Sequence, residues 1–379
     1  MMIIKKTVCF LAAVLLILPQ NLPAAAENRA VSEILFELDT GKILYSENAD
    51  VPMPVGMMSK LLTILAAARE VEAGRLPLDK TVYAPASVAD EKGASVWLES
   101  GDPITVEELF KSVIIGNAND AALTLAAAAF GSEDKYLEKA AVIARELGLQ
   151  STVFTEASGF KDPGAQISSA ADMAKILSAL SKIDFIAPMF INRLDYVRGE
   201  DAQLVNTNKM ARSYNGCVGY KYSYSKPSGY CLAAGASQNG NRYGAVLLGY
   251  ADEDKMYTKA AKMLDAAFEY FTAFVPEPPE DLASEIRVKN GYAESVPVTA
   301  GEAGKYVIKK GQAANIEARI ILPEYVYAPV KAGQTVGEVH FYLEGEFFCK
   351  TKIIAAENVE GVTFDKNLAI IIKSVFDFG

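Results

Sequence analysis

Histidine is scarce in this sequence, and its scarcity excludes two common kinds of catalytic site. The single histidine, His340, lies near the end of the 379-residue chain. A Ser-His-Asp triad needs a histidine as its general base, and a histidine-rich metal site needs several. We therefore expect no such triad and no metal site, and nothing in the composition points to a cofactor.

Cysteine is also sparse. Of the four cysteines, Cys9 lies in the N-terminal segment, and Cys217, Cys231 and Cys349 lie further along the chain. Three is an odd number, so no complete disulfide framework is implied. Cys217 and Cys231 could face each other across a hairpin, but single buried thiols fit the sequence at least as well.

Positive charge is in deficit. The chain has 37 Lys and Arg residues against 47 Asp and Glu residues, which gives a formal net charge of −10. An acidic surface argues against nucleic acid as a partner. It also gives no general electrostatic reason to bind anionic lipid.

The sequence has no long apolar run after its N-terminal segment. Within that segment we expect a signal peptide over residues 1–26. Lys5 and Lys6 form a charged n-region, Val8 to Leu18 an apolar core, and the alanines at 24–26 a cleavage site. That core is too short to span a bilayer comfortably. Cleavage would remove two lysines and no acidic residue, so the formal net charge of −10 becomes about −12. We expect export to the cell envelope.

The remaining chain divides at the stiff segment Pro276-Glu-Pro-Pro279, where the composition shifts. We expect one domain over residues 27–275 and a small β-rich domain over residues 276–379, because short alternating runs separated by glycine turns follow the prolines. The apolar end, Asn367 to Gly379, fits a last strand and turn, or a short amphipathic helix that contacts the membrane surface from one side. We favour the strand.

One helix stands out within the first domain. From Met57 to Ala73 the chain has no Gly or Pro and is rich in Leu and Ala, which is typical of a buried helix. Lys60 lies in its first turn, where the helix dipole disfavours a cation. The simple interpretation is a lysine that extends to water, and the alternative is a chemical role.

The other predicted elements frame this helix. Apolar periodicity, caps and turn residues predict a hairpin over Ser32 to Tyr45 turning at 39–42, helices at 106–115, 120–128, 134–147, 168–180 and 255–274, and a second hairpin with strands at 231–235 and 243–249.

Three short segments form a pattern along the first domain. They are Met57-Met-Ser-Lys60 at the start of a helix, Asn117-Ala-Asn119 between two helices, and Lys221-Tyr-Ser223 before a strand. In order and spacing they resemble the Ser-x-x-Lys, Ser-x-Asn and Lys-Thr-Gly motifs of the serine D-alanyl-D-alanine carboxypeptidases, the low-molecular-mass penicillin-binding proteins. Flanking segments look like the same family: Lys60-Leu-Leu-Thr, Asn119-Asp-Ala-Ala, Glu146-Leu-Gly-Leu, Ser169-Ala-Ala-Asp-Met-Ala, Asn206-Thr-Asn and Gly229-Tyr-Cys-Leu.

The resemblance runs from about Ala30 to Phe274, and the later β-rich region is similar to the C-terminal domain of the same proteins. It implies an α/β fold of the penicillin-binding-protein and β-lactamase type, with an antiparallel sheet flanked by helices and a helical subdomain, followed by a small all-β domain. It also implies peptidoglycan stem peptides as the ligand. By the same resemblance Lys60 and Asn119 hold catalytic positions, and Lys221 is the expected carboxylate ligand.

The active-site motifs nevertheless depart from the family. Met57 occupies the nucleophile position, and a thioether has no proton to lose to a lysine one turn later. Asn117 stands where the second motif has its serine, and an amide does not readily relay protons. Tyr222 and Ser223 replace the threonine and glycine of the third motif, and we expect them to add bulk beside a bound substrate.

Two serines could substitute for the missing nucleophile. Ser59 is adjacent to Lys60, but neighbouring helix residues point about 100° apart. Ser223 and Lys226 have the right spacing, but in a strand residues i and i+3 face opposite ways.

We therefore expect a non-catalytic relative that binds stem peptides or a cell-wall partner. One alternative is an active carboxypeptidase with a non-standard nucleophile, which would trim the terminal D-alanine of stem pentapeptides. The other is a structural protein of the cell wall.

Overall fold

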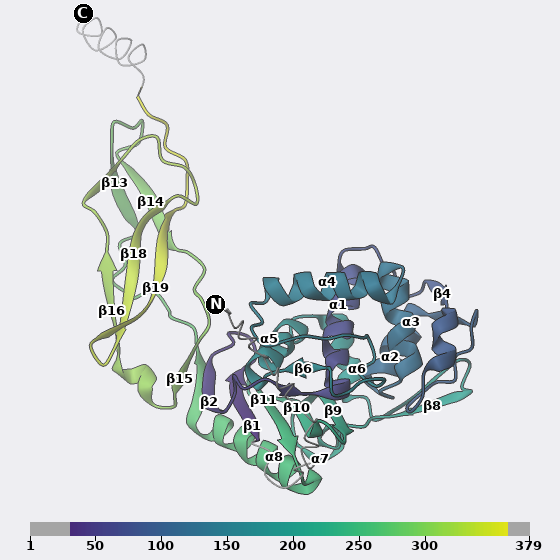
Figure 1. The fold of residues 1–379 in the computed structure, drawn as a ribbon. Coiled ribbons are helices and arrows are strands. Elements are labelled where there is room, and N and C mark those ends of the chain that lie inside the picture. Colours follow the sequence, from purple (N-terminus) through teal and green to yellow (C-terminus); the bar gives the residue numbers. More distant parts are fainter. Residues whose placement is uncertain (1–30, 363–379) are drawn as a thin grey trace, which may run out of the picture.

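A five-stranded antiparallel sheet organises the first part of the chain (Figure 1). The structure, a computed structural model, describes residues 31–362. The strand order is β2-β1-β11-β10-β9, built from hairpins between neighbouring strands and the pairing of β1 with β11. Its strands are β1 (Ser32–Glu37), β2 (Ile43–Glu47), β9 (Cys217–Ser225), β10 (Gly229–Gln238) and β11 (Asn241–Tyr250).

Helices cover both faces of this sheet. On one face α8 (Glu253–Tyr270) packs against β10 and β11. Its buried residues recur at helical spacing, and an Asp252 N-cap accepts a hydrogen bond from the backbone N–H of Lys255. On the other face α5 (Ala170–Leu180) packs against β1 and β11, and α1 (Lys60–Glu72) packs against α5. The middle of β10 is therefore buried on both sides.

Three of the remaining helices pack around α1: α2 (Val106–Ile114), α3 (Asn119–Phe130) and α4 (Glu133–Glu146). Of the two short helices, α6 (Ala187–Ile191) packs against α2 and β9, and α7 (Met210–Ser213) packs against α6 and β9. Short strands pair between them: β3 (Met53–Pro54) with β6 (Ile167–Ser168), β4 (Thr81–Tyr83) with β5 (Pro103–Thr105), and β7 (Leu194–Val197) with β8 (Ala202–Val205).

The second part of the chain is an all-β domain. Its six-stranded sheet has the order β16-β18-β19-β14-β13-β17. The strands are β13 (Glu285–Lys289), β14 (Ser295–Ala300), β16 (Ile316–Ile321), β17 (Tyr325–Tyr327), β18 (Thr335–Leu343) and β19 (Glu346–Ala355). Val296 and Ile353 lie at the centre of its separate apolar core.

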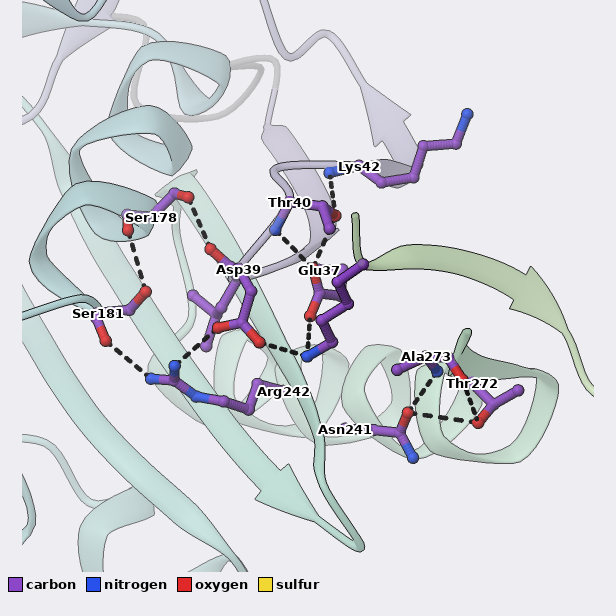
Figure 2. Close-up of polar contacts among 12 residues, drawn as sticks. Glu37, Asp39, Thr40, Lys42, Ser178, Ser181, Asn241, Arg242, Thr272 and Ala273 are labelled. Carbon is purple, nitrogen blue, oxygen red and sulfur yellow. Dashed lines mark hydrogen bonds and ion pairs between the residues drawn. The ribbon is translucent and has the colours of Figure 1, made fainter. Parts of the chain in front are cut away.

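The two domains meet at the β2 and β1 edge of the first sheet, and β9 lies at the opposite edge (Figure 1). The strand β12 (Phe271–Phe274), which follows α8, pairs with β15 (Tyr306–Lys309) of the second domain. Lys305 extends from the second domain to two carboxylates of the β1–β2 hairpin. Its Nζ lies 3.1 Å from Glu37 Oε1 and also pairs with Asp39. The other oxygen of Asp39 pairs with Arg242 (Figure 2).

The predicted fold class is confirmed, and the predicted helices are present with small shifts at their ends. The helix expected over residues 255–274 was too long, because residues 271–274 pair as a strand with β15. Cys217 lies opposite Ala236 and Cys231 opposite Ser223, so these two thiols do not face each other across the hairpin. The predicted signal peptide and the apolar end at 367–379 lie outside the described residues.

No helix within residues 31–362 is both long enough and apolar enough to cross a membrane.

Candidate functional site

Lys60 is the first residue of α1 and is fully buried. The 3₁₀ turn Gly56–Ser59 leads into the helix, and the Lys60 Nζ donates a hydrogen bond of 2.6 Å to Asn119 Oδ1. Burial lowers the pKa of Lys60 to about 7, and the carboxylates of Glu91, Glu156 and Asp120 only partly oppose this effect. The simple interpretation of a lysine extending to water was therefore wrong, because no part of Lys60 reaches the surface.

Met57 lies in the 3₁₀ turn that precedes Lys60 and is only half-buried. Its Sδ is 3.9 Å from Asn117 Nδ2, a weak contact between a thioether and an amide. The contact places the two substituted positions side by side. Neither group can transfer a proton at this point.

The connection between α2 and α3 supplies the two asparagines. Asn117 has a left-handed backbone with φ +56°, which Asn tolerates better than most residues, and its Oδ1 is buried without a hydrogen bond. Asn119 begins α3 and is fully buried, and its Nδ2 donates to the carbonyl of Lys92. The pair of bonds made by Asn119 fixes the Lys60 ammonium relative to the segment that contains Lys92.

Lys221 lies within β9, at the edge of the sheet, rather than before a strand as the sequence suggested. Its Nζ donates 2.9 Å to the carbonyl of Val113 at the end of α2. The side chain is 1% exposed, so the interpretation as an ordinary exposed strand lysine was wrong. Burial and repulsion from the Lys60 ammonium hold the pKa of Lys221 well below its usual range.

The two residues after Lys221 lie on different sides of the sheet. The Tyr222 ring stacks on Tyr257 of α8 and Tyr230 of β10, so its bulk lies on the α8 face and not beside Lys60. The expectation that Tyr222 crowds a bound substrate was wrong for this reason. Ser223 is buried, and its Oγ donates to the carbonyl of Val55 at 3.4 Å.

Ser59 is badly placed for a nucleophile. Its Oγ is buried without a hydrogen-bond partner and lies against Gly159, where an added Cβ would come within 2.3 Å of it. It makes no bond to the Lys60 amine that a serine nucleophile would need.

The acidic residues around Lys60 were not found from the sequence. Glu91 and Glu156 are nearly buried. Glu91 pairs with Lys161 at 2.9 Å, and Glu156 accepts hydrogen bonds from Ser158 and from the backbone N–H groups of residues 161 and 162. A buried cation requires compensating charge, so the sequence could have signalled that acids were needed, but not which ones.

The site therefore joins two buried ammonium groups and two amides beside a half-buried thioether. It offers hydrogen-bond donors and positive charge, but no nucleophile one turn before Lys60. Within residues 31–362 no group of three or more His, Cys, Asp or Glu side chains could hold a metal ion.

Comparisons with known proteins find similar sequences over most of the chain. Residues 20–252 match the D-alanyl-D-alanine carboxypeptidase family, and residues 277–361 match the C-terminal domain of penicillin-binding protein 5. The chain is 30% identical to the D-alanyl-D-alanine carboxypeptidase DacF of Bacillus subtilis, over 89% of this chain and 87% of the relative. It is 31% identical to DacC of Escherichia coli, over 86% and 83%.

Solved structures share the fold. Penicillin-binding protein 5 of Haemophilus influenzae superposes with a TM-score of 0.75 at 24% identity, over 87% of this chain and 97% of that one. Penicillin-binding protein 6B of Escherichia coli gives a TM-score of 0.70 at 22% identity, over 88% and 98%.

Proposed function

The chain belongs to the D-alanyl-D-alanine carboxypeptidase family, and from this premise we propose that it is an exported, non-catalytic member that binds peptidoglycan stem peptides in the cell envelope. The observation that carries the proposal is Met57. Its thioether stands one turn before the buried Lys60, where the family's chemistry needs a hydroxyl.

The expected loss of turnover is large enough to favour an inactive site over a slow enzyme. Removal of the nucleophile in a serine hydrolase costs on the order of a million-fold in turnover. Asn117 adds to the loss, because its amide cannot relay a proton. Ser59 offers no substitute, since its hydroxyl is buried against Gly159.

The two buried lysines support the binding of a ligand that carries a carboxylate. The Lys60 and Lys221 ammonium groups repel each other, and burial lowers the pKa of both. A carboxylate brought next to Lys221 would relieve both effects by offering an opposite charge in a region of low dielectric. We propose that Lys221 binds the terminal carboxylate of a stem peptide, with Asn119 and Lys60 as its polar surroundings.

The first experiment treats the purified mature protein with a fluorescent penicillin. We expect no covalent label. Stoichiometric labelling that maps to any serine would overturn the proposal and establish an active enzyme with a non-standard nucleophile.

The second experiment is calorimetry with a stem-peptide mimic that ends in D-Ala-D-Ala. We expect saturable binding to the wild-type chain and its loss in Lys221→Met, with Lys226→Met as the control because Lys226 is exposed just beyond the same strand. Circular dichroism checks that both variants fold.

The same titration decides the alternative of a structural role. That role is favoured by the burial of Lys60, Asn119 and Lys221, which leaves only Met57 half-exposed at the site. Absence of any binding heat would support a closed site and contradict the binding proposal.

A further inference from the structure

A cavity lies near the site but is lined by none of the site residues. Its volume is about 340 Å³, and it lies between the C-terminal end of α5, the segment 184–191 and the beginning of β9. Pro188, Phe190 and Val218 form apolar walls, and Asp184, Arg242 and Cys217 also line it. This size and this mixture of apolar walls with a few polar groups are typical of small-molecule sites.

The two charged groups of the cavity are not equivalent. Arg242 is already engaged, because its Nη1 pairs with Asp39 at 2.7 Å and its Nη2 donates to the carbonyl of Ser181 at 2.9 Å (Figure 2). Asp184 is exposed and has no ion-pair partner among residues 31–362. The charge available to a ligand is therefore negative, and the complementary ligand group is a cation.

The cavity is connected to the site through strained backbone. Gly219 and Tyr220 have φ values of +96° and +101°, and the second value is rare for a bulky residue. The Tyr220 ring lines the cavity and contacts Phe190 at a centroid distance of 5.1 Å. Lys221, which directly follows, donates its bond into the site at Val113. A displacement of Tyr220 would therefore be transmitted to Lys221 over a single peptide bond.

We propose that this cavity binds a small aromatic amine, and that occupancy shifts Lys221 through Tyr220. The ring of the ligand packs on the apolar wall of the cavity beside the Phe190–Tyr220 pair, and its ammonium group pairs with Asp184. Aromatic rings favour offset or edge contacts with each other, and a cation beside an aromatic wall gains further attraction. The ligand needs no covalent step and no metal.

The test uses 2-phenylethylamine as the probe and 2-phenylethanol as its neutral counterpart. Binding to the mature protein is followed by NMR of the [15N]tyrosine-labelled chain, in which Tyr220 and Tyr222 are assigned from their Phe variants. We expect saturable shifts of both amides with the amine, and at least ten-fold weaker binding of the alcohol.

Two variants test the contacts. Asp184→Asn should weaken amine binding about ten-fold, whereas Asp281→Asn, an exposed carboxylate of the second domain, should leave it unchanged. Ala187→Trp places a bulky ring at an exposed position of the cavity wall and should abolish binding without disturbing the core.

Each contrary result has a defined meaning. Absence of saturable amine binding, or equal binding to the wild type and Asp184→Asn, overturns the site. Binding that shifts Tyr220 but leaves Tyr222 unmoved overturns the connection to Lys221. No stem peptide enters the experiment, so its outcome is independent of the proposed function.

Discussion

Replacing Lys60 by methionine should make the first domain more stable at slightly acidic pH, although it removes a buried hydrogen bond. The side chains have similar length and both are unbranched, so methionine can occupy the same space. The change removes a buried cation whose pKa falls from 10.5 to about 7 on folding. It also leaves Asn119 Oδ1 without its 2.6 Å donor.

The magnitude follows from these two effects. Each pKa unit corresponds to about 1.4 kcal/mol, so at pH 6 the lowered pKa of Lys60 destabilises the wild type by on the order of 5 kcal/mol. The orphaned buried acceptor costs the variant about 1–3 kcal/mol. We therefore expect Lys60→Met to raise the free energy of unfolding by about 2–4 kcal/mol at pH 6.

The pH dependence of the stability difference between the variant and the wild type tests the same reasoning a second time. Between about pH 7 and 10.5 the unfolded chain keeps a proton on Lys60 that the folded chain has released, so wild-type stability rises with pH through that window. The variant lacks this contribution. Its advantage should shrink as the pH rises, vanish between about pH 8 and 10 and then reverse, because near pH 10.5 only the cost of the orphaned Asn119 acceptor remains.

The assay is urea unfolding at pH 6, 8 and 9.5, followed by circular dichroism at 222 nm. Every α-helix of the described residues ends by Tyr270, so this signal reports mainly on the first domain. Lys262→Met, which removes an exposed lysine of α8, serves as the control and should change little. A variant less stable than the wild type at pH 6, with a pH-independent difference, would refute the assignment of Lys60 as a costly buried cation.

Three further predictions concern other features. Met57→Ser should restore little penicillin acylation, because the second and third motifs also differ; rapid labelling of this variant would show an otherwise intact site. Gly159→Ala should destabilise the fold by about 2–4 kcal/mol in the same urea assay. The reason is that φ at this position is +67° and the new Cβ would lie 2.3 Å from Ser59 Oγ. A loss of stability under about 1 kcal/mol would contradict that packing. Lys305→Met should leave the buried Glu37 carboxylate without its cation. We expect a lower melting temperature and a larger radius of gyration, measured by small-angle scattering. Unchanged values would show that this ion pair does not hold the two domains together.

Local signals in the sequence were sufficient where neighbouring residues determine the structure. Helix α2 begins where expected because Thr105 and Glu108 form a reciprocal capping box. The first hairpin turns between Glu37 and Ile43 as its turn residues predict. Both features depend on residues within a few positions of each other.

The sequence failed where distant segments decide the outcome. Residues 271–274 continue the helical composition of α8 but form a strand, because β15 offers hydrogen-bond partners more than thirty residues later in the chain. The environment of Lys60 depends in the same way on Glu91 and Glu156, which lie on separate loops. The direction of Tyr222 follows from its contact with Tyr257 on α8, which no local pattern reveals.

The cost of the two buried lysines bears on the choice between a binding role and a structural one. A purely structural site would be better served by apolar side chains, since a buried cation destabilises a fold unless its partners repay the lost hydration. Lys60 and Lys221 are both covered and repel each other, so stability alone does not account for them. Functional sites commonly carry such destabilising groups. If Lys60→Met gains stability while Lys221→Met loses the stem-peptide heat, the lysines serve a ligand; if both replacements destabilise the fold and no ligand heat is found, they serve the structure.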